Sequence, residues 1–484
     1  MKRNYGYPTF PRWMPDTTLH KEDTKMNRIE TSVGIDLAKR STHKAVVIQH
    51  DTGGQTSSKR AFSFSHDLEG LNALIEHIVR KTGMDSLEQT TITMEPTSGV
   101  WEPVASFLKA NGAQVFYTRT DIVAALRKAQ NKFAKTDRVD ARTLGGFTWS
   151  MPERMIPYNE IEPRVRKLRN LSNQRRSLVD ETTDWKNRFI SHLEPIWLPV
   201  LMNLDKEQRF SKLFRAFIQR FVVPGRLIQY GRTRFETWLE KHSHGNTSHE
   251  LVDLLWEGTE KAAALLGFLE TQGALVFDTA TLKEIFMQDL RIIAFLEKET
   301  ERSETLIKEA RKDIPECDLV QELPGVGDAI APTITGVLMP VDRFPSCKKC
   351  GAYTGYTSRK KQSGDHDIKG LKITKTGNSN LKRDLVLAAD TAMHNDPELA
   401  AFAIRLLEKG KHYNKVRVAV GRKIAVRAYA LLKKFAAGQH NVHYRWRTLE
   451  GTPISQKEAK VIAQFLWTDY KRQHSQKKKP ARSR

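Results

Sequence analysis

The sequence predicts an α/β domain with a mixed β-sheet, then a helical, coiled-coil-like region, then a mainly α-helical C-terminal domain. In residues 29–160, short β-branched runs alternate with amphipathic helical patterns, which is typical of α/β domains. In residues 161–316, charged and apolar side chains mix at helical spacing over long stretches. In residues 317–440, a glycine-rich basic segment is followed by further helical patterns. Residues 1–28 and 441–484 are expected to form a mobile basic leader and a basic C-terminal extension with a low-complexity tail.

In the α/β domain, the expected order is three strands, a helix, a strand, a helix, a strand and a helix. The strands are expected at 31–36, 43–50, 59–65, 90–96 and 113–118, and the helices at 68–83, 100–112 and 120–129. This order matches the mixed-sheet plan of ribonuclease H-like domains, in which the first and fourth strands are parallel neighbours. We therefore predict a ribonuclease H-like sheet.

Four acidic residues are candidates for one metal site in this domain. Asp36 ends the first expected strand and Glu95 ends the fourth, so parallel pairing would make them neighbours. Asp137 and Asp140 lie three residues apart in a segment of helical propensity, so both carboxylates would share one face. Four converging carboxylates would be strongly disfavoured without a cation, whereas two Mg²⁺ ions would turn them into a clamp on a phosphodiester.

Each of the four acids also has a simpler interpretation. Asp36 could cap a turn, Glu95 could lie on the surface, and Asp137 and Asp140 could be ordinary acids in the first turn of a helix. Individually these interpretations are the safer ones. Taken together, in this strand order and on a basic chain, the acids favour a metal site.

The charge of the chain favours a phosphate-rich partner. Among 484 residues, 79 are Lys or Arg and 56 are Asp or Glu, giving a net charge of +23 and an isoelectric point near 9.8. No apolar run approaches the ~18 residues that a membrane span needs, so no membrane partner is expected. Three cysteines do not make a disulfide framework, which favours the cytoplasm. Cys347 and Cys350 have the spacing of half a zinc site, but His366 alone cannot supply the other half.

Basic side chains and glycines near these segments are the candidate contacts to nucleic acid. They are Lys132, Lys135, Arg138, Arg142, Arg169, Arg175, Arg176, Gly325, Gly327, Lys360, Lys361, Lys375 and Arg383. The two glycines belong to Pro-Gly-Val-Gly at 324–327, which is either a helix–hairpin–helix turn that holds a phosphate or a plain helix connector.

The helical region is expected to form long antiparallel helices or a coiled-coil arm, and hence a self-association element. Its second half carries an apolar stripe at spacings of three and four, which includes Leu282, Ile285 and Phe286. Residues 197–280 interrupt the pattern and are interpreted as a possible insertion.

Three stretches of the α/β domain resemble the acidic motifs of the DEDD-type insertion-sequence transposases. They are VGIDLAKRSTHKAVV, TMEPTSGVWEPVASFLKANG and KTDRVDARTL, within residues 33–144. The resemblance implies a RuvC-like N-terminal domain in which Asp36, Glu95, Asp137 and Asp140 bind two Mg²⁺ ions. Some members of this family are guided by a bridge RNA, so the resemblance also implies a structured RNA as a partner.

Residues 351–389, GAYTGYTSRKKQSGDHDIKGLKITKTGNSNLKRDLVLAA, resemble the second domain of the same family. In that family a serine in the Ser-Gly element is the nucleophile, which places it here at Ser363. Many relatives have a second glycine where this chain has Asp365. The residues alone would not choose Ser363 over Ser358 or over Ser379, which is expected to be a helix N-cap.

The expected function is therefore that of a transposase or recombinase that cuts and rejoins DNA through a phosphoserine–DNA intermediate. The resemblance implies double-stranded DNA substrates (element ends and target) and a nucleoid-associated prokaryotic setting. It further implies a homodimer or homotetramer that unites the acidic and serine sites of different protomers. Two alternatives remain open: a RuvC-like hydrolytic nuclease or junction resolvase, and a non-catalytic nucleic-acid-binding scaffold.

Overall fold

The structure is a computed structural model that describes eleven segments of the chain. These are residues 31–51, 54–57, 60–96, 99–129, 136–243, 248–274, 278–356, 362–363, 366–367, 373 and 376–475. The chain divides into two compact units, Met1–Ile161 and Glu162–Arg484, and each is described by itself. The predicted leader at 1–28 and most of the low-complexity tail lie outside the described residues.

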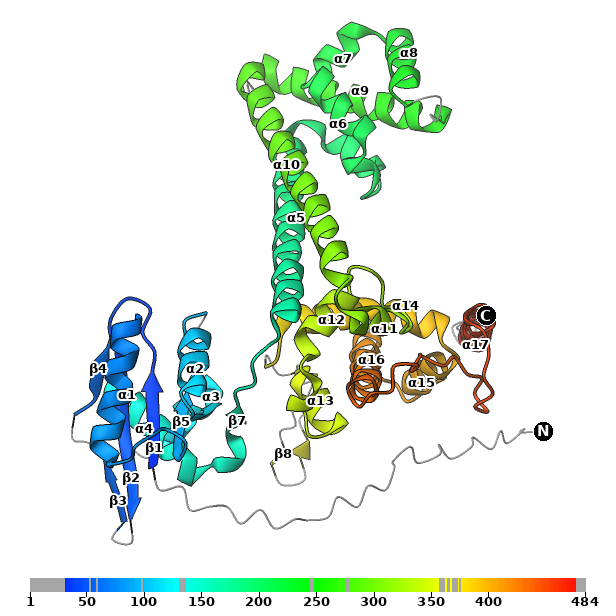
Figure 1. Cartoon of the computed structure of the whole chain (residues 1–484). Helices are drawn as coiled ribbons and strands as arrows, with labels where there is room; N and C mark the ends of the chain where they lie inside the picture. The colour runs from blue at the N-terminus through cyan, green and yellow to red at the C-terminus, as the bar shows by residue number, and fades with distance from the viewer. Residues whose placement is uncertain are drawn as a thin grey trace. The chain divides into compact units, whose positions relative to one another are not determined.

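The first unit is built on a seven-stranded mixed sheet (Figure 1). Its strands are β1 (Thr31–Asp36), β2 (His43–Asp51), β3 (Gly54–Ser57), β4 (Phe62–Phe64), β5 (Thr90–Met94), β6 (Gln114–Tyr117) and β7 (Ile156–Pro157). The order is β3-β2-β1-β5-β6-β7, with β4 also paired to β2. β5 is parallel to both β1 and β6, and the other pairs are antiparallel. The predicted parallel pairing of the first strand with the strand at 90–96 is thus confirmed.

Helices cover both faces of this sheet. They are α1 (Leu68–Thr82), α2 (Trp101–Ala110), α3 (Thr120–Ala129) and α4 (Asp137–Ser150), with a 3-10 turn η1 (Pro152–Arg154) after them. Because side chains alternate along a strand, Val33 and Ile35 of β1 enter the main core with α1 and α2. Val46 and Ile48 of β2 point to the opposite face, where they pack with Ala141 of α4. The helix α4 therefore lies against β1, β2 and β5 on the face opposite the main core, and α3 packs on it.

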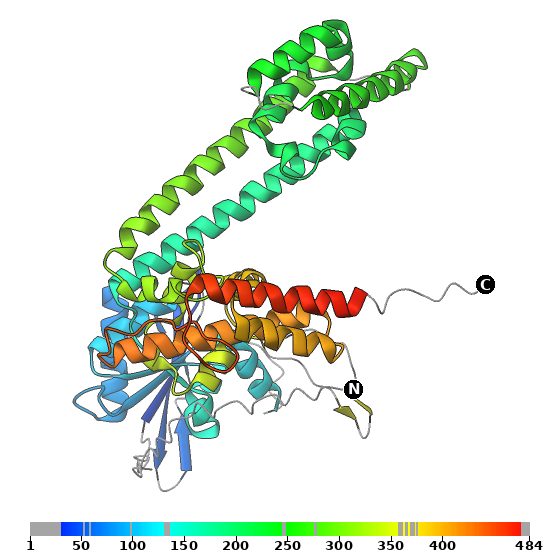
Figure 2. The ribbon, with the colours of Figure 1, turned by 90° about the vertical axis from the view of Figure 1, so that its right-hand side faces the viewer.

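The second unit begins with two long helices that lie side by side (Figures 1 and 2). They are α5 (Pro163–Asn203), about 60 Å long, and α10 (Thr279–Arg311), about 50 Å long, at ~1.5 Å per residue. Since the chain runs out along α5 and returns along α10, the helices are antiparallel, which agrees with the long helices predicted for this region.

The described residues of the segment at 197–280 fold into a small helical head between the ends of α5 and α10 (Figure 1). Its elements are η2 (Gln208–Phe210), α6 (Lys212–Phe221), α7 (Pro224–Tyr230), α8 (Arg232–His242) and α9 (His249–Thr271). Fully buried aromatic side chains form its core together with the end of α5, among them Trp197, Phe217, Phe221 and Phe235. The head therefore shares one core with the adjoining ends of α5 and α10.

The rest of the second unit is a helical domain. Its elements are α11 (Pro315–Gln321), α12 (Ala331–Leu338), η3 (Val341–Arg343), α13 (Cys347–Tyr353), β8 (Gln362–Ser363), β9 (His366–Asp367), α14 (Ser379–Asn395), α15 (Pro397–Glu408), α16 (Tyr413–Ala436) and α17 (Gln456–Ser475). The helix α17 lies in the predicted C-terminal extension and was not expected as a helix; it packs on α14 and α15 through Ala459, Ala463 and Trp467. Within the described segments, no helix has the length and apolar character needed to cross a membrane.

Candidate active site

Asp36 and Glu95 lie at neighbouring strand ends. Ile35 of β1 pairs with Met94 of β5 in parallel register, and the two acids are the next residue in each case. The carboxyl ends of parallel neighbours share one edge of a sheet, so both backbones emerge there. The buried strands VGI and TITM hold this register, because their side chains are almost fully enclosed.

The helix α4 crosses β1 so closely that only glycine fits at the crossing. The Ser32 hydroxyl donates to the Gly145 carbonyl oxygen over 2.8 Å, and a Cβ on Gly34 would lie 1.9 Å from the Ala141 carbonyl oxygen. Ser32 thus lies next to Gly145, and Gly34, two residues later in β1, lies next to Ala141, four residues earlier in α4. The strand and the helix therefore run in opposite directions at the crossing. Two more strand residues (about 6.6 Å) reach Asp36, and four more helix residues (about 6 Å) reach Asp137. The first turn of α4 therefore lies at the edge of the sheet where Asp36 and Glu95 emerge.

The two acids of α4 differ in their surroundings. Thr136 caps the helix by accepting from the Val139 amide over 3.3 Å, and the Asp137 side chain is exposed. Asp140 is largely buried and accepts a 2.6 Å hydrogen bond from the Arg127 guanidinium of α3. The role of Arg127 could not be predicted from the sequence, because nothing in the spacing of α3 indicates which carboxylate this arginine contacts.

The end of β1, which carries Asp36, and the end of β5, which Glu95 follows, lie at the same edge of the sheet as the first turn of α4. The acidic side chains of the described residues are not gathered into a complete set of metal ligands. Among the described residues, no three Asp, Glu, His or Cys side chains form a group that could hold a metal ion. The donor chemistry nevertheless suits Mg²⁺, which prefers carboxylate oxygens and keeps several of its waters. Asp140 Oδ2 has no hydrogen-bond partner in the described part of the chain, so one oxygen of this carboxylate is available to a cation.

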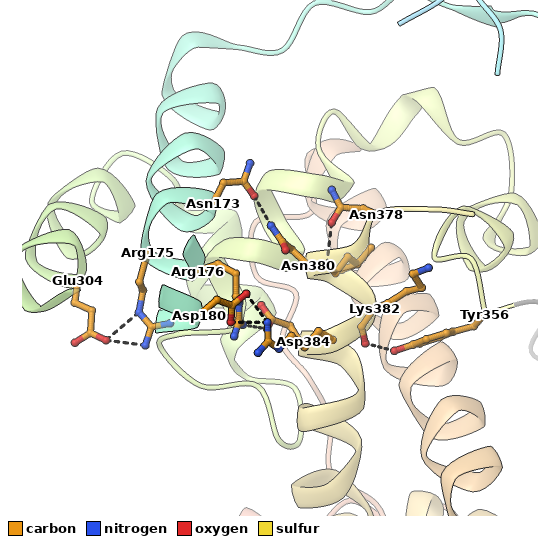
Figure 3. A network of polar contacts seen from close by, with 12 residues as sticks. Asn173, Arg175, Arg176, Asp180, Glu304, Tyr356, Asn378, Asn380, Lys382 and Asp384 are labelled. Atoms are coloured by element: carbon orange, nitrogen blue, oxygen red, sulfur yellow. Dashed lines mark hydrogen bonds and ion pairs between the residues drawn. The ribbon is translucent and has the colours of Figure 1, made fainter. Parts of the chain in front are cut away.

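Three predicted nucleic-acid contacts are engaged inside the second unit, where α5 meets α10 and α14 (Figure 3). Arg175 bonds Glu304, Arg176 pairs with the fully buried Asp384, and Arg383 pairs with Asp180. Close by, the Asn380 amide donates to Asn173 over 2.9 Å. These partners are 129 to 208 residues away in the chain, so the sequence shows only a basic stripe. In this structure these guanidinium groups tie helices together.

Other predicted contacts fall in different places. Arg138 is exposed, Arg142 is half-buried with its own contact inside the chain, and Arg169 packs against Gly336 of α12. Five more lie outside the described residues: Lys132, Lys135, Lys360, Lys361 and Lys375.

The Pro-Gly-Val-Gly turn connects α11 with α12 and packs on α14. Gly325 has a φ of 75°, and a Cβ there would lie 2.1 Å from the Ala388 carbonyl oxygen, so this glycine permits a close approach to α14. Gly327 is exposed, and a Cβ on it would meet nothing within 4 Å. Of the two glycines, Gly327 alone faces open space.

The segment that carries Ser363 leaves and re-enters the helical domain at one point. A Cβ on Gly355 would lie 1.8 Å from the Thr376 carbonyl oxygen, and one on Gly377 would lie 2.7 Å from the Tyr353 carbonyl oxygen. Both glycines have positive φ, 74° and 86°. The two ends of the segment are therefore in contact, and the Tyr356 hydroxyl adds a hydrogen bond to the Lys382 carbonyl of α14.

Within that segment, Ser363 ends β8 and pairs with His366 of the antiparallel strand β9. Ser358 and Asp365 lie outside the described residues. The expectation that Ser379 is an N-cap is wrong: Asn378 caps α14 by accepting from the Leu381 amide over 2.9 Å, and Ser379 is the first helical residue. Asn and Ser are similar N-caps, so the sequence Asn-Ser-Asn did not distinguish them.

Two family comparisons match separate parts of the chain. Residues 33–198 match a family described as a transposase and named for the IS110-type DEDD enzymes. Residues 317–403 match the family described as Transposase IS116/IS110/IS902. The first match contains the four acids and the second contains Ser363, while residues 199–280 of the head lie outside both.

Individual proteins give the same result at low identity. The chain is 22% identical over 300 residues to an uncharacterized 43.6 kDa protein of insertion element IS110 from Streptomyces coelicolor, covering 62% of this chain and 71% of that protein. It is 26% identical over 128 residues to the pilin gene-inverting protein of Moraxella lacunata and 25% identical to that of Moraxella bovis. The latter matches cover 26% of this chain and 40% of each relative.

Proposed function

We propose a mechanism for a chain that carries both transposase domains of the IS110 family: it cuts and rejoins DNA with a carboxylate-bound metal site and a serine nucleophile. The observation that supports the proposal is the parallel register of β1 and β5, which ends next to Asp36 and Glu95, together with the close crossing of β1 by α4, the helix that carries Asp137 and Asp140. Ser363 belongs to the second matched segment. The element ends and the target site would be the DNA substrates.

In this mechanism the carboxylates of Asp36, Glu95, Asp137 and Asp140 would bind the metal ions. Two bound Mg²⁺ ions would supply positive charge to the attacking and leaving oxygens of the phosphodiester. The parallel register of buried strands supports the backbone at Asp36 and Glu95, and the glycine contact with β1 supports the backbone of α4, which carries the other two acids. Rigid elements hold ligands more accurately than loops do.

The nucleophile in this mechanism is Ser363. Its Oγ attacks the scissile phosphorus and forms a P–Oγ ester while the bond between phosphorus and the leaving deoxyribose oxygen breaks. The serine proton leaves with a base or water, and the released oxygen takes up a proton. Because one ester replaces another, a second DNA hydroxyl can reverse the step without ATP. The closed base formed by Gly355 and Gly377 supports this role, since it fixes where the serine segment begins and ends.

The partners follow from charge and from the relatives. A net charge of +23 suits both DNA and a structured guide RNA. Two relatives are named for inverting a pilin gene, and we assign this chain to the same broad class of strand exchange. A homodimer or homotetramer would let the acids of one protomer act with Ser363 of another.

A covalent-adduct assay tests the proposal. Purified protein is incubated with Mg²⁺, DNA carrying the element's ends, and RNA transcribed from its flank; denaturing gels then separate free DNA from protein-linked DNA. We expect an adduct with the wild type and with Ser379→Ala, and none with Ser363→Ala or Asp137→Ala. Cleavage that survives Ser363→Ala but not Asp137→Ala would make water the nucleophile and the enzyme a hydrolytic nuclease. DNA binding without cleavage of any substrate, with or without Mg²⁺, would instead indicate a scaffold.

A further inference from the structure

We propose that Arg127 is a positioning residue that orients Asp140, so that Oδ1 accepts from the guanidinium and Oδ2 is presented to the metal ion. This inference rests on the proposed function, because it assigns Asp140 as a ligand. It adds a residue from α3 that lies outside the four acids.

The geometry of the contact supports orientation. Arg127 Nη1 donates to Asp140 Oδ1 over 2.6 Å, and no second bond joins the two side chains. A two-point contact would occupy both carboxylate oxygens, whereas this one-point contact engages one and leaves the other. The pair therefore fixes the rotation of the carboxylate and still leaves a ligand atom.

Burial makes the contact specific. The Arg127 and Asp140 side chains keep only 15% and 13% of their exposure. Val123 and Leu126 anchor α3 in the unit, so the guanidinium starts from a fixed backbone. A buried carboxylate needs a partner for its charge, and Arg127 supplies one before any metal is bound.

Metal-ligating carboxylates are commonly held by such outer hydrogen bonds, and losing one typically costs about 10- to 100-fold in metal affinity. A purely electrostatic role predicts the opposite sign. Removing a positive charge next to a ligand should by itself strengthen cation binding, since Arg127 repels the incoming ion. The direction of the change in affinity thus separates orientation from electrostatic competition.

The experiment measures Mn²⁺ binding to the full-length protein by calorimetric titration and by the electron paramagnetic resonance signal of free Mn²⁺, without DNA. The variants are Arg127→Ala and Arg127→Lys, with Arg119→Ala as the control. Arg119 directly precedes α3 and pairs with Asp121 on the surface, so its removal deletes the same charge from an exposed pair. We expect affinity to fall about tenfold in Arg127→Ala, to recover in part in Arg127→Lys, and to stay unchanged in Arg119→Ala.

Melting curves of each variant show whether the first unit stays folded, and Arg127→Lys serves as the readout if Arg127→Ala does not. Unchanged or tighter Mn²⁺ binding in folded Arg127→Ala would overturn the orienting role and favour competition between arginine and metal. Failure of the proposed function looks different: the wild type would then bind no Mn²⁺, or Asp137→Ala would bind it as well as the wild type does.

Discussion

Gly34 of β1 lies directly against Gly145 of α4. A Cβ on Gly34 would lie 2.2 Å from the Gly145 amide nitrogen, and a Cβ on Gly145 would lie 3.1 Å from the Gly34 amide nitrogen and 2.8 Å from Ile48 Cδ1. The strand and the helix thus meet backbone to backbone, and the contact fixes the height of α4 above the sheet. The same contact sets the distance between the end of β1, which carries Asp36, and the start of α4, which carries Asp137 and Asp140.

Gly34→Ala should therefore push α4 away from β1. Overpacking at a site bounded by backbone atoms costs about 1–3 kcal/mol or more. We expect a lower melting temperature of the first unit and weaker Mn²⁺ binding. Gly99→Ala is the control, because a Cβ at Gly99 would meet nothing within 4 Å. Unchanged Mn²⁺ affinity in a folded Gly34→Ala protein would show that the acids do not depend on the position of α4.

A substitution at a second glycine contact should affect the proposed serine site and leave the proposed metal site unchanged. Gly355→Ala adds a Cβ 1.8 Å from the Thr376 carbonyl oxygen at a positive φ, so the ends of the serine segment must move apart. We expect covalent adduct formation to be lost while Mn²⁺ binding to the first unit stays at the wild-type level. Gly225→Ala in the head, where a Cβ has open space, should leave both readouts unchanged. Adduct formation by Gly355→Ala at the wild-type rate would contradict this view.

The main strands and helices could be predicted because their buried apolar side chains recur in the sequence at the spacing of a strand or of a helix. The strands β1, β2 and β5 are β-branched and buried, so their positions could be derived from the sequence. The parallel pairing of β1 with β5 was predicted from the order of strands and helices, which matches the ribonuclease H-like plan. The strand β3, with the sequence GQTS, carries no such pattern and exists through its pairing with β2.

The site was less accessible from the sequence. Asp137 and Asp140 were indicated by their spacing, but Arg127 was not, since a tertiary contact between helices leaves no periodic signal. For the same reason, the basic stripe of α5 suggested phosphate contacts, whereas Arg176 is paired inside the chain with Asp384.

The buried pair of Arg176 and Asp384 yields a stability prediction. Asp384 has no exposed side-chain surface, so Arg176→Met would leave a buried carboxylate without its cation, at a cost of about 3–5 kcal/mol. Arg383→Met is the matched control, because its pair with Asp180 is roughly half exposed and worth about 0–1 kcal/mol. Urea denaturation followed by circular dichroism compares them. Equal midpoints for the two variants would contradict a structural role for Arg176, and adding Asp384→Leu to Arg176→Met should recover part of the loss.

The contact between the head and the long helices α5 and α10 should lose stability in acid, because it involves Glu297 of α10. Hydrogen bonds from Arg215 of α6 and then from Lys186 of α5 lower the pKa of Glu297 from its ordinary value near 4.5 to about 2, although partial burial opposes the shift. Because the folded-state pKa is depressed, the stabilisation is complete above about pH 4.5 and is lost as the pH falls toward 2. Unfolding by urea, followed by circular dichroism, should therefore occur at lower concentrations as the pH drops through this range.

The variant Glu297→Gln tests whether this carboxylate is responsible. It should lower the urea midpoint at pH 7 and flatten the dependence of that midpoint on pH between 4.5 and 2. A variant that keeps the wild-type slope would place the acid sensitivity in another group.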